Sequence, residues 1–158
     1  MVQSKNTNNS IYNIGCLGKI SDYRKSKDGR VLINLTGITR FEILDEKIND
    51  KLYREFKVNY KNFEKDIIQK EEGKISSSKL MEKSKIFFKR NGLLLNWKEF
   101  EKLDQTQMVN TLAMISPVTN EEKQKLLETI SLEEKIKTLE NIVNFYLHDT
   151  NFNNRTIQ

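Results

Sequence analysis

The first part of the chain, residues 11 to about 60, has the apolar and polar alternation that is typical of β-strands. Asp28 and Gly29 lie between two mainly apolar segments, Leu17 to Tyr23 and Val31 to Leu35. Because glycine adopts a positive φ at little cost, this dipeptide predicts the turn of a β-hairpin.

The second of these segments, Val31 to Leu35, is apolar at all but one position. Such a run predicts a central strand that is covered on both faces. Gly37 predicts a turn after it, followed by another strand from Thr39 to Leu44. Further on, Glu55 to Tyr60 alternates polar with apolar residues, which predicts a half-buried strand.

The polar tract from Lys61 to Ser78 contains charged residues, one glycine and three consecutive serines, which favours a loop or hinge. Beyond this tract the apolar residues recur at helical spacing and predict a helix that ends at Gly92. The face shared by this helix consists of Leu80, Ser84, Phe87, Phe88 and Asn91.

Four pairs of residues have the composition of a capping box, in which a side chain accepts a hydrogen bond from an amide of the first helical turn. The pairs are Asn96 with Glu99, Asp104 with Gln107, Thr119 with Glu122, and Ser131 with Glu134. They predict several short helices. The last helix has the clearest apolar stripe, formed by Leu132, Ile136, Leu139, Ile142, Val143 and Tyr146.

These patterns predict an α+β protein with two parts and a tail. We expect residues 1–75 to form a β-rich lobe, residues 76–150 a bundle of α-helices, and residues 151–158 a disordered tail.

Composition adds little to this picture. With 158 residues, 37% of them apolar, the chain is long enough for one domain or two small units. The formal net charge is +5, but acidic residues are interleaved with the basic ones. No apolar run approaches the roughly 18 residues of a membrane helix, and the first residues are polar. We therefore expect a soluble cytoplasmic protein without a membrane partner.

Few residues suit catalysis or metal binding. Neighbouring carboxylates such as Glu71 and Glu72 diverge on a helix and do not converge on a substrate. His148 is expected at the surface, at the C-terminal end of the last helix, and Cys16 as a small buried hydrophobe. A single cysteine forms no internal disulfide, and no zinc-ligand spacing is present. We predict no cofactor and no metal.

Two separated blocks carry the most specific pattern. The first comprises Ile14 to Ile20, Asp28-Gly29-Arg30 and Leu35 to Phe41, and the second runs from Leu112 to Leu139. In order and spacing they resemble the substrate-binding N-terminal domain of Lon-type ATP-dependent proteases. The family's sheet signature corresponds to Gly18, Gly29, Gly37, Arg40 and Phe41. Its helical signature corresponds to Leu112, Ala113, Pro117, Lys123, Gln124, Leu126, Leu127, Glu128 and Leu139.

The resemblance implies a PUA-like lobe followed by a helical bundle. The signature residues have structural explanations, with glycines in turns, leucines in the core and Pro117 between helices. The family opens with an apolar strand and a helix that have no counterpart here, so Met1 is either an internal methionine of a longer reading frame or the start of a shortened form. A sheet that lacks strands exposes an edge, and we predict poor solubility or self-association.

The resemblance also bears on catalysis. It places the Ser-Lys peptidase dyad and the ATPase in domains outside this chain, and no Gly-x-x-x-x-Gly-Lys phosphate loop occurs. Ser78-Lys79 and Ser84-Lys85 are adjacent pairs that point apart on a helix. We therefore predict that the chain is not an enzyme.

The first functional hypothesis is a non-catalytic Lon N-terminal-like domain for protein quality control or proteolysis. It binds unfolded or partner polypeptides, with a protease or chaperone among the candidates, through apolar surface between the lobes. Aromatic residues supply much of the contact energy of binding surfaces, so the candidate residues are the exposed members of one aromatic set. That set is Tyr53, Phe56, Phe63, Trp97 and Phe100. The alternative for each is that it fills the core.

The second hypothesis is an RNA-binding PUA-like module. One basic group lies at the hairpin tip, at Arg24, Lys25, Lys27 and Arg30. The other lies on the first helix, at Lys79, Lys83, Lys85, Lys89 and Arg90. Aromatic residues are weakly interleaved with both groups, and fold analogy alone is weak support, so nucleic acid is the less favoured partner.

Overall fold

The computed structural model of the protein describes residues 10–68 and 76–148. The chain divides into two compact units, residues 1–71 and residues 72–158. All described strands belong to the first unit and all described α-helices to the second. The predicted α+β class, with a β-rich half followed by a helical half, is confirmed. The tail predicted to be disordered, residues 151–158, lies outside the described residues.

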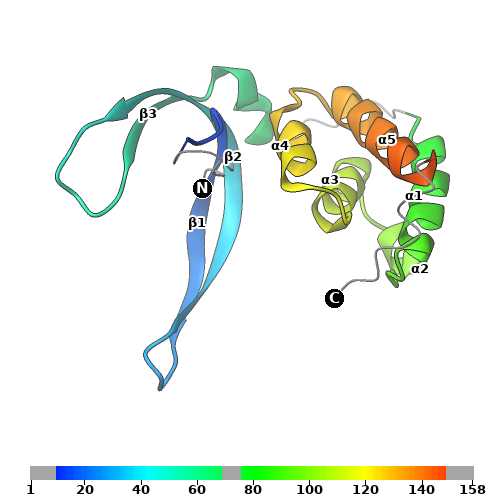
Figure 1. Ribbon diagram of the computed structural model, residues 1–158, viewed down its shortest axis with the longest axis horizontal. Helices are drawn as coiled ribbons and strands as arrows, with labels where there is room; N and C mark the ends of the chain where they lie inside the picture. Colours follow the sequence, from blue (N-terminus) through cyan, green and yellow to red (C-terminus); the bar gives the residue numbers. More distant parts are fainter. Residues whose placement is uncertain (1–9, 69–75, 149–158) are drawn as a thin grey trace. The chain divides into compact units, whose positions relative to one another are not determined.

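The first unit is built on a three-stranded antiparallel sheet of order β1-β2-β3 (Figure 1). Its strands are β1 (Ile14–Lys25), β2 (Val31–Lys47) and β3 (Glu55–Asn59). The turn between β1 and β2 is closed by a 3.0 Å hydrogen bond from the Gly29 amide to the Ser26 carbonyl. Gly29 has a φ of +85°, which a residue with a Cβ adopts only with strain. The predicted hairpin is therefore confirmed.

The turn predicted at Gly37 is wrong, because β2 continues through this residue. Gly37 pairs with Gly18 of β1, and the register then skips Ile38. A second shift skips Ser21 of β1. A β-bulge of this kind absorbs one extra residue and bends the strand without ending it. The glycine thus lies inside a long bulged strand instead of between two strands.

The coverage predicted for Val31 to Leu35 is also wrong. β2 is the middle strand, as predicted, but β3 pairs only with its last part, Glu42 to Lys47. The first part of β2 pairs with β1 alone, and the two strands form a long two-stranded arm (Figure 1). Within the described residues of the first unit, no element covers the apolar side chains of this segment, and they are 43–68% exposed.

A small core lies at the base of the arm. It contains Phe41 of β2 and Phe63, which are 8% and 2% exposed. Phe63 belongs to a short 3-10 helix, η1 (Lys61–Asp66), in the tract predicted to be a loop. The correction has a tertiary cause, because Thr39 Oγ1 donates a 3.4 Å hydrogen bond to the Phe63 carbonyl. A mainly charged tract gives little local sign of such a contact.

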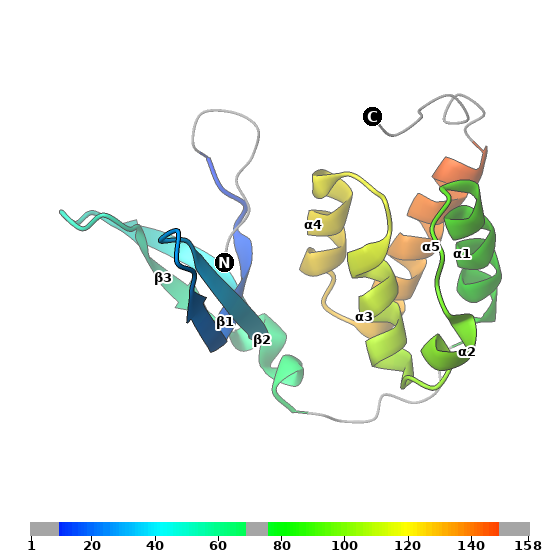
Figure 2. The same cartoon turned by 90° about the horizontal axis from the view of Figure 1, so that it is seen from below.

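The described part of the second unit, residues 76–148, forms five α-helices. They are α1 (Ser78–Arg90), α2 (Trp97–Phe100), α3 (Gln105–Ile115), α4 (Asn120–Glu128) and α5 (Leu132–His148). α1 packs along α5, and α3 and α4 also contact α5 (Figure 2). The predicted end of α1 is confirmed, since Asn91 caps the helix and Gly92 follows with a φ of +67°.

At all four predicted helix starts, the hydrogen bond from a first-turn amide to the capping side chain is confirmed. The side chains of Asn96, Asp104, Thr119 and Ser131 each accept a hydrogen bond from the amide three residues later. The reciprocal bond of a capping box is present at Thr119, whose amide donates to Glu122 at 2.8 Å. Glu134 accepts instead from the amide of Ile130, one residue before the predicted cap.

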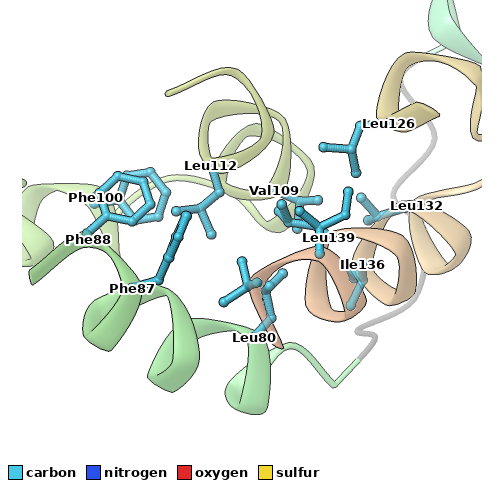
Figure 3. Packing of buried hydrophobic residues seen from close by; sticks show 12 residues of the cluster. Leu80, Phe87, Phe88, Phe100, Val109, Leu112, Leu126, Leu132, Ile136 and Leu139 are labelled. Carbon is cyan, nitrogen blue, oxygen red and sulfur yellow. The ribbon is translucent and has the colours of Figure 1, made fainter. Parts of the chain in front are cut away.

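The predicted helical faces meet in one hydrophobic core (Figure 3). Val109 and Leu112 of α3 and Leu139 of α5 have no exposed surface, and Phe87 of α1 is 2% exposed. The full buried cluster is Leu80, Phe87, Phe88, Phe100, Val109, Leu112, Leu126, Leu132, Ile136, Leu139, Ile142 and Val143. Tyr146 is half-buried against it.

The two residues singled out for possible chemistry have plain positions. His148 ends α5 and is exposed, as predicted. Cys16 is half-buried and not buried, because it lies in β1, at the edge of the described sheet. No group of three or more metal-ligating side chains is present among the residues that the structure describes.

Candidate binding surface

The two-stranded arm has one apolar face. In the register of the sheet, Ile20 is directly opposite Leu35, and Tyr23 is directly opposite Ile33. Directly opposite residues of an antiparallel pair project to the same face, as do alternate residues of one strand. The bulge at Ser21 keeps Ile20 and Tyr23 on the same face, because it inserts one residue between them. We call these residues, together with Val31, the arm face.

The arm face is solvent-exposed. Its members Ile20, Tyr23, Val31, Ile33 and Leu35 are 58%, 63%, 53%, 44% and 43% exposed. A side chain of this size offers on the order of 150 Å² of surface, so the half-exposed arm face presents on the order of 400 Å². The largest apolar patch of an ordinary monomeric protein has about this size and is often an interaction site.

The opposite face of the arm is mainly polar. Asp22 pairs with Asn34, and Lys19 pairs with Thr36. The Ser21 hydroxyl, at the bulge, donates a 3.3 Å hydrogen bond to the Asn34 carbonyl. The apolar exception is Leu32, which pairs with Arg24 and is 68% exposed. The arm is therefore amphipathic, with the apolar side chains concentrated on one of its two faces.

The arm face borders an open depression of about 460 Å³. Its lining residues are Ile20, Ser21, Asp22, Tyr23 and Ile33. Such a shallow and largely apolar depression suits a side chain of another polypeptide better than a small polar ligand, which needs several converging hydrogen-bonding groups.

A second exposed apolar group lies in the loop between β2 and β3. Ile48 and Leu52 are fully exposed, and Tyr53 is 61% exposed, around an open depression of about 300 Å³. The base of the loop is closed by Arg54, whose Nε and Nη2 each donate to a different oxygen of Glu46 at 2.6 Å. This hydrogen-bonded guanidinium lowers the pKa of the Glu46 carboxyl.

The basic tip of the arm is partly neutralised. Arg24 pairs with Asp22 at 3.2 Å, and Arg30 pairs with Asp28 at 2.6 Å. The hydrogen bond from the Arg30 side chain holds the pKa of Asp28 below its ordinary value. Within residues 10–68 no ion pair involves Lys25 or Lys27. The tip thus retains a positive charge, although a smaller one than its sequence indicates.

The predicted aromatic residues do not form one cluster. Phe63 and Phe100 are 2% and 5% exposed and fill the cores of different units, so they are not exposed members of the set. Tyr53 is exposed, and Phe56 is half-buried beneath the guanidinium of Arg54, with Cζ 5.1 Å from the ring centroid. Trp97 is half-buried against the helical core.

Trp97 has two aromatic neighbours, Phe88 and Phe100, at centroid distances of 5.8 and 5.7 Å. The prediction that exposed aromatics bind polypeptide therefore concerns three side chains, those of Tyr53, Phe56 and Trp97.

Sequence reasoning missed the arm face. The alternation was visible at the end of the apolar segment, where Ile33 and Leu35 alternate with Asn34 and Thr36. Leu32 made the segment look continuous and favoured a strand covered on both faces. The better signal was the opposing strand, in which Ile20 and Tyr23 are separated by two polar residues, as a bulged amphipathic strand requires.

The family signature residues make structural contacts. The Arg40 guanidinium forms an ion pair with Asp66 of η1 and lies 4.5 Å from the Phe63 ring centroid. In α4, the buried Gln124 donates a 2.9 Å hydrogen bond to Glu128. Three leucines of the signature, Leu112, Leu126 and Leu139, belong to the helical core. Pro117 lies between α3 and α4.

Comparisons with known proteins agree with this fold. The family model for the ATP-dependent protease La (LON) substrate-binding domain matches residues 1–144. A solved structure, the N-terminal domain of Mycobacterium avium complex Lon protease, matches with a TM-score of 0.58 and 16% identity. The match covers 90% of this chain and 76% of that one. No curated protein matches. None of the described helices has the length and apolar character needed to cross a membrane.

Proposed function

Because this chain belongs to the family of the ATP-dependent protease La (LON) substrate-binding domain, we propose that it is a non-catalytic module that binds polypeptides. The observation that carries the proposal is the exposed arm face, an apolar patch on a unit whose own core is small. Burying such a patch releases water from apolar surface, which stabilises a complex with a partner that presents apolar side chains.

Unfolded polypeptides have the chemistry that this surface requires. They expose apolar side chains together with unpaired backbone amides and carbonyls. The two-stranded arm can contact both kinds of group, since it has apolar side chains on one face and backbone amides and carbonyls along its edges. Binding of this kind is tolerant of sequence, because the backbone contributes much of it.

The loop of Ile48, Leu52 and Tyr53 is proposed as an additional contact. Its fully exposed apolar side chains match the expectation that Tyr53 takes part in binding. Phe56 and Trp97 are retained as proposed contacts with smaller contributions, because each is already half-buried. We place the module in protein quality control or proteolysis in the cytoplasm, with unfolded polypeptides, a protease or a chaperone as its partners.

The exposed edges of the arm also support the self-association proposed from sequence. A two-stranded ribbon with exposed apolar side chains is a template for pairing with another chain. We propose weak association that increases with protein concentration. Sedimentation across a range of concentrations tests it, and a strict monomer at the highest concentration would contradict it.

The experiment that tests the proposed function is fluorescence anisotropy of the intact chain. The two probes are a labelled unfolded polypeptide and a labelled single-stranded RNA, each at low and physiological salt. We expect saturable polypeptide binding that persists at physiological salt, with little RNA binding, because apolar contacts are not screened. Binding of RNA alone, lost as salt increases, would overturn the proposal and support the basic tip as the site.

A further inference from the structure

We propose that the arm binds its polypeptide by strand addition. An extended segment joins the outer edge of β2 along Val31 to Leu35, places alternate apolar side chains beside the arm face, and sets a carboxylate near Lys25 and Lys27. The inference rests on the proposed function and specifies its site, its geometry and the class of sequence that it binds.

The backbone of β2 supplies the first argument. β2 has 17 residues, and β3 pairs with its outer edge only from Glu42 to Lys47. Among the described residues no strand pairs with this edge along Val31 to Leu35. A strand added there would continue the sheet in the position that β3 occupies further along β2. Its backbone would form hydrogen bonds with amides and carbonyls of β2 that pair with no other strand among the described residues.

The side chains supply the second argument. Val31, Ile33 and Leu35 lie at alternate positions, so they recur every 6 to 7 Å or so along one face. A bound extended segment has the same repeat, and its alternate side chains lie directly beside those of β2. Apolar β-branched or aromatic residues at every second position of the ligand would therefore extend the arm face into a wider apolar sheet surface.

Charge supplies the third argument and gives the ligand an acidic end. Lys25 is directly opposite Val31, and Lys27 follows in the turn. Neither lysine is in an ion pair within residues 10–68, whereas Arg24 and Arg30 are paired with aspartates. A carboxylate at the ligand end nearest the turn would meet these ammonium groups. The preferred segment thus alternates apolar with polar residues and ends in acidic ones.

The arm face is too small to hold a second copy of the chain stably, so the weak self-association proposed above does not make a second copy its main occupant. It presents on the order of 400 Å², whereas a stable interface between two proteins buries about 800 Å² on each partner. The chain's own terminal sequences, residues 1–9 and 149–158, are mainly polar and lack the alternation of apolar residues that the edge requires. A peptide strand fits the area, the repeat and the charge.

The test uses the full chain and a synthetic peptide of about ten residues that alternates valine with threonine and ends in two aspartates. Ile33→Thr removes an apolar side chain from the arm face. Leu32→Thr makes a comparable change on the opposite face, at the neighbouring and more exposed residue. Threonine is β-branched, so both variants retain a residue that favours β-strands.

We expect Ile33→Thr to weaken peptide binding about fivefold or more, as for a central contact of an interface, and Leu32→Thr to leave it within about twofold. Lys27→Gln should weaken binding two- to threefold or so and reduce its dependence on salt. The same peptide with its central residue replaced by proline should bind much more weakly, because the proline nitrogen has no hydrogen to donate to the sheet.

The outcomes separate this inference from the proposed function. If an unfolded polypeptide binds but Ile33→Thr and Leu32→Thr have equal effects, strand addition at β2 is wrong while polypeptide binding stands. A stable dimer that Ile33→Thr dissociates would likewise overturn the inference, since the arm face would then join two copies. If no unfolded polypeptide binds at all, the proposed function itself fails.

Discussion

Arg40 and Asp66 form a three-point contact although they are 26 positions apart in the chain. Arg40 Nε and Nη2 donate to the two carboxylate oxygens at 2.9 and 2.8 Å, and the Arg40 amide donates to Oδ2 at 3.0 Å. The guanidinium also lies 4.5 Å from the ring centroid of Phe63. One side chain thus joins β2 to η1 and covers the buried aromatic ring beneath the sheet.

Breaking this contact should destabilise the sheet unit. Asp66→Asn leaves the Arg40 guanidinium, only 12% exposed, without its charged partner, and we expect a loss of about 2 kcal/mol of folding stability. Arg40→Lys should also destabilise, because an ammonium group lacks the fork that binds both oxygens. Urea unfolding followed by circular dichroism gives the stability, and hydrogen exchange at the Arg40 amide reports the contact directly.

The control is Lys102→Gln, which removes the pairing of Lys102 with Glu99, where both side chains are more than 60% exposed. We expect Lys102→Gln to lower the folding stability by less than about 1 kcal/mol. Equal losses for Asp66→Asn and Lys102→Gln would contradict the structural role of the Arg40–Asp66 pair.

The helical core should depend on α3. Leu112→Ala removes a side chain with no exposed surface and should cost about 2–5 kcal/mol, because it leaves a cavity. Met114→Ala, two residues along the same helix, removes a side chain that is 68% exposed and should cost less than about 1 kcal/mol. Fluorescence of Trp97, the single tryptophan, follows unfolding of the same core in both variants. Equal stabilities would mean that α3 packs through a different face.

Glu122 should link the start of α4 to the end of α5. Its Oε2 accepts from the Thr119 amide at 2.8 Å and from the Tyr146 hydroxyl at 2.7 Å. Tyr146→Phe should cost about 1 kcal/mol, typical of one hydrogen bond to a charged group that is partly exposed. A double-mutant cycle with Glu122→Gln, measured by thermal unfolding, should show coupling. Strictly additive losses would argue that the Tyr146 hydroxyl and Glu122 act independently.

Acid should weaken the fold through its paired carboxylates. Hydrogen bonds from Arg30, Arg54 and Lys137 lower the pKa values of Asp28, Glu46 and Glu133. A carboxyl whose pKa is lower in the folded state stabilises at neutral pH, and this contribution is lost as the pH falls through its folded-state pKa.

Melting temperatures should therefore be level near neutral pH and fall below about pH 4, where carboxyl groups bind protons. These three carboxylates are solvent-exposed, so the decrease from each should be small and should diminish with added salt. Glu133→Gln, which cannot titrate, should show a smaller decrease than the unaltered chain. A rise in stability on acidification would contradict the assigned ion pairs.

The helical half could be predicted from sequence because its signals are local. A capping residue and its amide are three positions apart, and the stripe from Leu132 to Val143 repeats with the helical period. The chain therefore contains, within one or two turns, most of the information that fixes each helix. The one difference from the predicted capping boxes at Glu134 is the donor: its side chain accepts a hydrogen bond from the amide of Ile130 and not from that of the capping residue Ser131.

The sheet half could be predicted less well because its decisive contacts are distant in sequence. η1 is held by contacts of Thr39 and Arg40 with residues of this segment, including Phe63. The lysine- and glutamate-rich composition of the segment gives no sign of these contacts. β2 passes through Gly37 because a bulge lies at the next residue, and bulges depend on the opposing strand. The exposure of the arm face depends on what covers it, and no pattern within one strand encodes that.

The candidate site shows the same division. Aromatic character identified side chains of high contact energy but did not separate the buried Phe63 and Phe100 from the exposed Tyr53. Burial is a property of the folded unit, whereas residue type is local. The arm face became visible only when the register placed Ile20 opposite Leu35 and Tyr23 opposite Ile33.

The most direct test of the central claim, that the sheet unit binds polypeptide through exposed apolar surface, is amide chemical-shift mapping by NMR. An unfolded polypeptide is titrated into the isotope-labelled chain. We expect saturable shifts concentrated on β2 between Val31 and Leu35 and on the facing residues of β1, with smaller shifts at the loop of Ile48 and Leu52. Shifts confined to the helical unit, or no shifts at saturating polypeptide, would contradict it.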